Sequence, residues 1–164
     1  MIDEKRLEGI DMTTLEKSIT STVYVVRNGR VLLHIHKKFN TWFPLGGHVE
    51  RQELPHEAAI REAHEEAGLK IRLASTEIAP PIDVGRVERI PAPFCLYGEE
   101  GREEDYFDFI YIATTDDETL HPNRDESKVF RWFSKEELLE SDVKPHIKNT
   151  ALAVLEFLER TIDI

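Results

Sequence analysis

The chain has 164 residues, of which 40% are apolar and 32% charged, a size and composition typical of one folded domain and not of a disordered or fibrous protein. Its 32 acidic and 21 basic residues give a formal net charge of −11, which disfavours binding to duplex nucleic acid. A small phosphorylated ligand stays compatible with this charge, because bound divalent cations reverse the local potential. Cys95 is the only cysteine, and no apolar run reaches the length of a signal peptide or membrane span. We therefore expect a cytoplasmic protein with no membrane contact.

The first clear structural pattern is a β-hairpin near the N-terminus. Residues 1–18 form a polar N-terminal extension with some helical character around Thr14 to Ile19. The runs Thr22–Val26 and Val31–Ile35 are rich in β-branched and apolar residues, and the pair Asn28-Gly29 between them is typical of a tight turn.

A connection and a helix follow the hairpin. The stretch Phe39–Gly47, rich in aromatic residues, proline and glycine, reads as a loop. Three alanines spaced four apart predict a helix over 55–67, with Pro55 in its first turn and Gly68 as its stop. Leu54 falls at the N-cap position, although its side chain cannot accept a hydrogen bond.

The remainder of the chain predicts further strands and two helices. We expect strands at Ile71–Glu77, Phe94–Tyr97, Tyr106–Thr114 and Lys128–Phe133, with a charged loop at Gly98–Asp105. Ser134 and Glu137 form a capping box for a short helix, and Pro145 opens the last one. These elements predict an α/β protein of the α+β kind, a mixed β-sheet covered by helices on its faces.

Three glutamates of the predicted helix carry the chemical signal. Glu62, Glu65 and Glu66 are spaced three and four apart, so they lie near one another on the helix surface, where each unpaired like-charge pair costs roughly 0.2–0.5 kcal/mol. A hard divalent cation such as Mg²⁺, or Mn²⁺ in its place, offsets this repulsion. Because Mg²⁺ commonly completes its coordination with substrate phosphate, the pattern also predicts a phosphorylated substrate.

Neighbouring residues are suited to support such a site. Arg61 is placed to pair with Glu65 or to reach Glu53 in the preceding loop, and so to hold these acids in position. Gly46 and Gly47 permit a close approach of the backbone to a metal ion.

The segment Gly47–Leu69 resembles the signature of the Nudix hydrolases at every specified position. That signature reads Gly, five residues, Glu, seven residues, Arg-Glu, an apolar residue, any residue, Glu-Glu, any residue, Gly and an apolar residue. The resemblance implies a single Nudix domain over 1–164, in which 47–69 is a catalytic loop, helix and loop. It also implies hydrolysis of the diphosphate linkage in a nucleoside diphosphate joined to another moiety, with water activated by Mg²⁺.

Carried over residue by residue, the resemblance assigns roles to the matching positions. Metal ligands would be Glu62, Glu65, Glu66 and the Gly46 carbonyl, and structural support would come from Gly47, Glu53, Arg61 and Gly68. The general base stays open between Glu66, Glu62 and Glu126, since some relatives use a glutamate in the loop before a late strand. Weaker candidates of that kind are Glu103, Glu104, Asp116 and Asp117.

Histidine and aromatic side chains near the signature are candidates for substrate contact. His34 and His36 occupy alternate positions of a predicted strand and so share one face, and His48 follows the two glycines. Trp42, Phe43 and Phe107 are suited to stacking on a base, although core packing is the alternative for at least two of them. Many relatives have proline directly before the two glycines, whereas in this chain Leu45 lies between Pro44 and the glycines.

Two other functions compete with hydrolysis. An isoprenoid-diphosphate isomerase of the same fold would depend on a cysteine, and Cys95 lies in no matching motif. A nucleotide-sensing domain without catalysis would be expected to have lost signature acids, all of which are present. The substrate is left open, with specificity expected from the region Pro80–Glu104, and the assembly is expected to be a monomer or a homodimer.

Overall fold

The structure is a computed structural model, and it describes residues 19–76, 80, 82–83, 85–100 and 105–162. The strands in this part are β1 (Ile19–Arg27), β2 (Arg30–Ile35), β3 (Trp42–Phe43), β4 (Leu45–His48), β5 (Arg72–Leu73), β6 (Cys95–Glu100), β7 (Asp105–Thr114) and β8 (Phe130–Phe133). The helices are α2 (Pro55–Ala67), α3 (Lys135–Glu140) and α4 (Pro145–Ile162). The predicted extension over 1–18 lies outside the described residues, and Ile19 belongs to β1 instead of a helix.

All eight strands join one mixed sheet. Its main path runs β3-β2-β1-β7-β5, with β4 paired to β1, β6 to β7 and β8 to β2. The long β1 and β7 run parallel, whereas the other pairs are antiparallel. The predicted hairpin is confirmed, with Val26 opposite Val31 and positive φ angles of 51° at Asn28 and 69° at Gly29.

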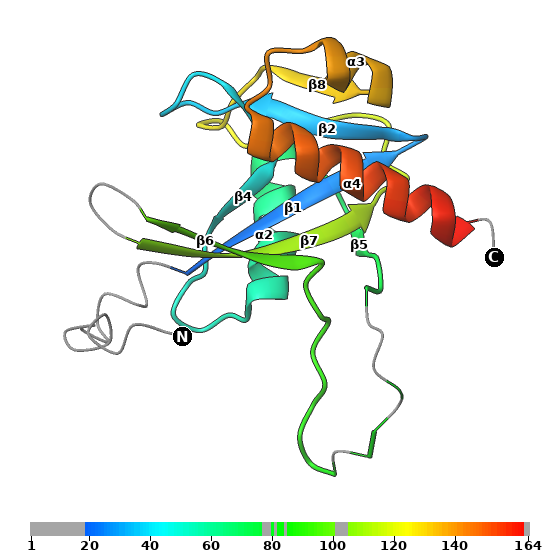
Figure 1. Ribbon diagram of the computed structural model, residues 1–164. Helices are drawn as coiled ribbons and strands as arrows, with labels where there is room; N and C mark the ends of the chain where they lie inside the picture. Colours follow the sequence, from blue (N-terminus) through cyan, green and yellow to red (C-terminus); the bar gives the residue numbers. More distant parts are fainter. Residues whose placement is uncertain (1–18, 77–79, 81, 84, 101–104, 163–164) are drawn as a thin grey trace.

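Helices cover both faces of this sheet (Figure 1). Alternate residues of β1 point to opposite sides, so Tyr24 and Val26 pack in the core beneath α4, while Val23 and Val25 pack against α2. The predicted α+β arrangement is therefore confirmed. In the described part of the chain, neither α4 nor another helix combines the length and apolar character needed to cross a membrane.

Helix α2 has the predicted bounds. The Leu54 N–H donates to the Glu57 carboxylate at 2.7 Å, so an acid in the first turn satisfies the backbone at the start where the Leu54 side chain cannot. At the end, Gly68 adopts the left-handed conformation, with φ 69°, and its N–H donates to the His64 carbonyl at 2.8 Å.

The prediction of a loop over Phe39–Gly47 is wrong, because this stretch contains β3 and β4. These strands have two and four residues, and Pro44, which has no N–H, separates them. Pairing with longer partners stabilises them: Phe43 lies opposite His34, and Leu45 lies opposite Val23. Such short strands depend on their neighbours, so the local sequence did not reveal them.

Other strand boundaries also differ from the prediction. The strand expected over Ile71–Glu77 is reduced to β5, and Glu77 lies outside the described residues. β6 extends to Glu100, so the first part of the predicted charged loop is paired with β7. β8 begins at Phe130 and not at Lys128. The two predicted helices are confirmed: α3 has the capping box of Ser134 and Glu137, and α4 begins at Pro145.

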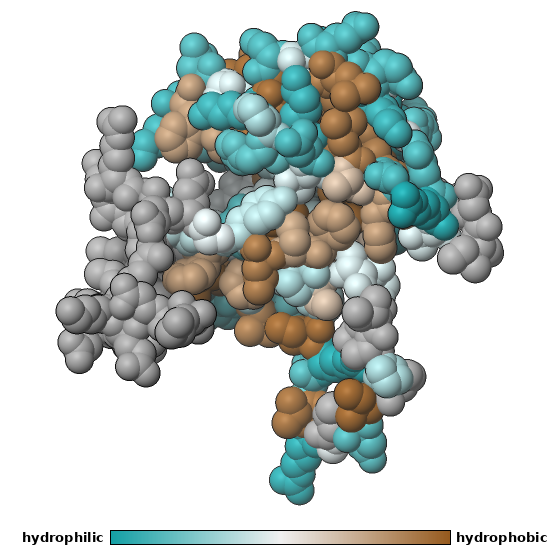
Figure 2. Space-filling view, viewed as in Figure 1, coloured by the Kyte–Doolittle hydropathy of each residue, from teal (hydrophilic) through white to brown (hydrophobic). Residues whose placement is uncertain are grey.

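The segment between β5 and β6 projects from the body of the molecule (Figure 1). It carries exposed apolar side chains at Ile82, Val87 and Ile90, which are 59%, 71% and 41% exposed. Figure 2 shows apolar and hydrophilic side chains alternating along this projection. The expectation that this region sets specificity stays a prediction.

Candidate active site

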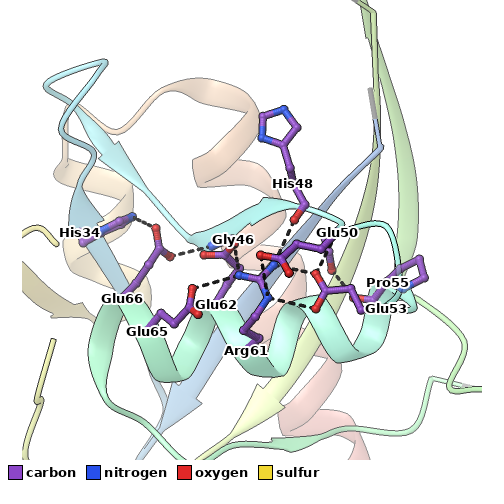
Figure 3. A network of polar contacts seen from close by, with 11 residues as sticks. His34, Gly46, His48, Glu50, Glu53, Pro55, Arg61, Glu62, Glu65 and Glu66 are labelled. Atoms are coloured by element: carbon purple, nitrogen blue, oxygen red, sulfur yellow. Dashed lines mark hydrogen bonds and ion pairs between the residues drawn. The ribbon is translucent and has the colours of Figure 1, made fainter. Parts of the chain in front are cut away.

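The three glutamates of α2 lie along the side of the helix that faces β4 (Figure 3). Their side chains differ widely in exposure, at 41% for Glu65, 14% for Glu62 and 8% for Glu66. The three carboxylates therefore lie at different depths: Glu65 is nearest the solvent and Glu66 is the most deeply placed.

Arg61 lies at the centre of the polar network (Figure 3). Its Nε and Nη2 atoms donate to the two oxygens of Glu53 at 3.0 and 2.7 Å. Its Nη1 atom donates to Glu62 at 2.7 Å and to Glu65 at 3.0 Å, and Nη2 also reaches the His48 carbonyl at 3.1 Å. One guanidinium thus joins the loop acid, two helix acids and the end of β4, and the bidentate contact fixes Glu53.

The charges of these acids are unequally compensated. Hydrogen bonding to Arg61 lowers the pKa of Glu53. Burial raises the pKa of Glu66 to about 8, the Gly46 N–H opposes this effect, and the charges of Glu62 and Glu126 add to it. Burial also raises the pKa of Glu62 in spite of its contact with Arg61. A cation placed among these carboxylates would remove the repulsion.

Two glycines of β4 bring the strand backbone against α2. The Gly46 N–H donates to Glu66 Oε2 at 2.9 Å. A Cβ atom at Gly47 would lie 2.4 Å from Glu62 Oε1, so a side chain there would displace the carboxylate. Glycine at this position allows Glu62 its observed place beside the strand.

Glu126 reaches the same region from the loop over 120–126, which is anchored to the end of α2. The His121 N–H donates to the Ala67 carbonyl at 2.8 Å, and the Asn123 N–H donates to the Glu65 carbonyl at 2.9 Å. The charge of Glu126 contributes to the raised pKa values of Glu62 and Glu66. The structure therefore brings Glu126 toward the carboxylates, although it lies far from them in the sequence.

Sequence reasoning missed this anchoring. A Cβ atom at Gly68 would lie 2.3 Å from the His121 carbonyl oxygen, so glycine is required for the close packing of the loop as well as for ending α2. The only signal in the sequence is Gly68, and a glycine at the end of a helix is already explained by its role in ending α2.

The predicted histidines lie in three different environments. His34 is 2% exposed, with Nε2 3.8 Å from Glu66 Oε1, and burial lowers its pKa to about 4, so at pH 7 it is neutral and places no positive charge beside Glu66. His36 is half-buried, with its ring 6.1 Å from that of His34. The His48 ring points away from the carboxylates (Figure 3).

Trp42 and Phe43, the aromatic candidates of β3, also lie in different surroundings. Trp42 packs edge-on against Phe133 at 5.1 Å, within the cluster beneath α4. Phe43 lies beside His36, with ring centroids 5.3 Å apart.

The weaker acidic candidates have other contacts. Asp116 pairs with Arg72 at 2.7 Å, and Asp117 accepts from the Lys70 N–H at 2.7 Å, near the end of β7. Glu103 and Glu104 lie outside the described residues.

The donor atoms of the site suit a hard divalent cation. Carboxylate oxygens are the ligands that Mg²⁺ and Mn²⁺ prefer, and Glu66 presents a buried carboxylate whose neighbours Glu62 and Glu126 are also acids. Across the described residues, no three acidic, histidine or cysteine side chains are grouped closely enough to hold an ion in this conformation. Glu62 and Glu65 are instead each hydrogen-bonded to Arg61.

Comparison with known proteins identifies the family of the chain. The family model described as NUDIX domain matches residues 17–153. A crystal structure of a NUDIX-family hydrolase from Clostridium perfringens is 36% identical, with a TM-score of 0.78 over 88% of this chain and 99% of that one.

More distant structures share the fold. A MutT NUDIX hydrolase from Burkholderia pseudomallei is 22% identical, with a TM-score of 0.59 over 85% of this chain and 95% of that one. An Ap4A hydrolase from C. elegans is 16% identical, with a TM-score of 0.59 over 89% of this chain and 98% of that one. The family match and the C. perfringens structure assign the chain to the Nudix hydrolases, a family of enzymes that use divalent metal ions to cleave nucleoside diphosphate derivatives.

Proposed function

We propose that this chain hydrolyses the diphosphate linkage of a nucleoside diphosphate joined to another moiety, in a reaction that depends on Mg²⁺. The observation that carries the proposal is the row of Glu62, Glu65 and Glu66 beside β4, with a buried carboxylate at one end. Mn²⁺ is expected to substitute for Mg²⁺, because both prefer oxygen ligands.

In this proposal each residue of the network has a distinct task. Glu62, Glu65 and Glu66 hold the metal, together with the Gly46 carbonyl. When bound, the metal neutralises phosphate charge and lowers the pKa of a coordinated water. Arg61 and Glu53 keep the loop before α2 in place through their bidentate contact, and Gly47 and Gly68 allow the close packing on either side.

We assign the general base to Glu126. It approaches from the 120–126 loop, whereas the proposed carboxylate ligands all belong to α2 and the Gly46 carbonyl to β4, and so it can face a water from a different direction. Glu66 and Glu62 are the alternatives, and both are engaged by neighbouring donors, Glu66 by the Gly46 N–H and Glu62 by Arg61.

The competing functions find less support. An isomerase would use a reactive thiolate, and burial raises the pKa of Cys95, which disfavours that form. A sensing domain has no need of the complete set of acids with their arginine and glycine partners.

A substrate panel tests the proposed reaction. The purified chain is mixed with Mg²⁺, Mn²⁺ or EDTA and with nucleoside triphosphates, ADP-ribose, nucleotide sugars and dinucleoside polyphosphates, the last because a C. elegans relative is an Ap4A hydrolase. We expect release of phosphate, pyrophosphate or a nucleoside monophosphate that stops in EDTA. Absence of turnover on every compound with both metals would contradict the proposal.

A further inference from the structure

We propose that a cluster of aromatic and lysine side chains beside the carboxylates binds the nucleobase of the substrate by stacking. We call this cluster the aromatic–lysine surface, and it consists of His36, Lys38, Phe39, Phe43 and Lys144. The inference rests on the proposed function and adds to it the place where the base is recognised.

The rings of this surface form a continuous aromatic layer. Phe39 and Phe43 stack with centroids 5.3 Å apart and an interplanar angle of 23°. The His36 ring lies against both, at 4.8 Å from Phe39 and 5.3 Å from Phe43. Phe39 is 51% exposed, so much of its ring is open to water while it also stacks on Phe43. A base stacked there would cover apolar surface and extend the layer by one ring.

Two lysines give the surface a local positive charge. The Nζ atom of Lys38 lies 5.5 Å from the centre of the Phe39 ring, and that of Lys144 lies 5.5 Å from the centre of the Phe43 ring. They come from the β2–β3 connection and from the residue before α4. In a chain with a net charge of −11, this concentration of cations on rings suits an anionic ligand with an aromatic part.

A short path connects the surface to the deepest carboxylate. His34 lies 3.8 Å from Glu66 through its Nε2 atom, and the His34 ring is 6.1 Å from that of His36. The charge of Glu126 also acts on His36. A nucleotide whose phosphates lie at Glu66 would therefore have its base within reach of Phe39.

Other aromatic side chains lack this combination. Trp42 packs on Phe133 within the hydrophobic cluster beneath α4. Phe107 is 48% exposed on β7, but it belongs to no described ring contact or lysine contact. The surface around Phe39 alone joins open ring area, positive charge and proximity to Glu66 among the described residues.

Removal of the Phe39 ring tests the inference. Steady-state kinetics are measured for the best nucleotide of the panel and for tripolyphosphate, which has no base. Since stacking contributes about 1–3 kcal/mol per base, Phe39→Ala should raise KM for the nucleotide by about 5- to 150-fold with little change in kcat. Phe39→Leu, which keeps apolar bulk against Phe43, should have a similar effect, and Phe39→Trp should restore a low KM. Values for tripolyphosphate should not change.

Leu139→Ala is the matched control, because Leu139 is an exposed apolar side chain on α3, 59% exposed. It should leave both substrates unaffected. An unchanged nucleotide KM in both Phe39→Ala and Phe39→Leu would overturn the inference and leave the proposed hydrolysis intact. The inference would also be overturned if Phe39→Ala raised KM for tripolyphosphate as much as for the nucleotide. A rise in the nucleotide KM in Phe107→Ala and not in Phe39→Ala would overturn it as well.

A binding measurement separates this inference from the proposed reaction. Calorimetric titration with adenosine 5′-(α,β-methylene)diphosphate and Mg²⁺ requires no turnover. If the wild type hydrolyses nothing but binds this analogue, and Phe39→Ala weakens binding by about 5-fold or more, the base site stands and the proposed hydrolysis fails. If the wild type neither binds the analogue nor hydrolyses the panel, both proposals fail.

Discussion

At the scale of single residues, the central feature is a glutamate kept where a carboxylate is costly. The Glu66 side chain is 8% exposed and accepts one backbone hydrogen bond, from Gly46, while its neighbours Glu62 and Glu126 are also acidic. Burial of a charge without a partner destabilises a fold, so such a residue is expected to serve binding and not stability.

The pH dependence of stability follows from this placement. Because burial raises the folded-state pKa of Glu66 to about 8, from 4.5 in the unfolded chain, the folded protein holds this proton more tightly. The stabilisation of the fold by this bound proton is fully present below pH 4.5 and is lost as the pH rises through 8. In EDTA, Glu66→Gln should therefore raise the melting temperature more at pH 8.5 than at pH 5. For a domain of this size, a change of roughly 1 kcal/mol in stability shifts the melting temperature by about 2–4 °C.

Thermal melts of both proteins in EDTA and in Mg²⁺ provide the measurement. Mg²⁺ should raise the melting temperature of the wild type at pH 8.5 and have little effect on Glu66→Gln. An equal difference between the two proteins at both pH values would show that Glu66 is not a strained buried carboxylate.

Gly47 gives a second prediction at this scale. In Gly47→Ala the new methyl group would meet Glu62 Oε1 at 2.4 Å, and the flexible carboxylate would move away. We expect kcat/KM to fall roughly 10- to 100-fold while the free energy of unfolding changes by less than about 1 kcal/mol. Gly98→Ala is the control, because a Cβ atom there has no neighbour within 4 Å. Equal activity of the two variants would argue against a role for Glu62 at its observed position.

Much of this residue-scale picture could be predicted from spacing. Residues three and four apart share a face of any helix, so Glu62, Glu65 and Glu66 had to lie together once α2 was recognised. Their unequal burial could not be predicted, because it depends on how closely β4 packs against the helix. The division of Arg61 among four oxygen-bearing partners likewise depends on tertiary contacts.

At the scale of elements, the position of Glu126 depends on the docking of one loop against one helix end. Gly68 ends α2 in a left-handed conformation and also leaves room for the His121 carbonyl. The predicted hairpin and the bounds of α2 were recoverable, since a tight turn, a first-turn proline and a terminal glycine are local signals. The short β3, β4 and β5 were not, because their stability comes from pairing with longer strands.

Gly68→Ala tests the docking of the 120–126 loop. Its cost combines the left-handed conformation, about 1–2 kcal/mol for a residue with a side chain, with a clash against backbone. Gly29→Ala is the matched control, since Gly29 has the same φ of 69° but no neighbour within 4 Å of a Cβ atom. In urea unfolding, Gly68→Ala should lose at least about 1 kcal/mol more than Gly29→Ala, and it alone should lower kcat. Equal losses in both variants would mean that the loop does not depend on Gly68.

At the scale of the whole molecule, the sheet holds in place the α2 carboxylates and the aromatic–lysine surface, the two parts of the proposed site. The parallel pair β1 and β7 forms its centre, α2 covers one face with the carboxylates, and α4 covers the other. The mixed sheet between helices could be predicted from the order of elements. The gathering of the β2–β3 connection and the start of α4 around Phe43 could not, because it arises only from the packed fold.

The most direct test of metal-dependent hydrolysis by the α2 glutamates is the turnover number of Glu66→Gln in saturating Mg²⁺. We predict a fall of about 10²–10⁴-fold, because loss of a metal ligand would remove several kcal/mol of transition-state stabilisation, with folding retained. Glu118→Gln, a change at an 81% exposed side chain paired with Arg27, should keep the wild-type rate. A Glu66→Gln enzyme as fast as the wild type, or a wild-type rate unchanged by EDTA, would contradict the assignment of the metal site to these glutamates.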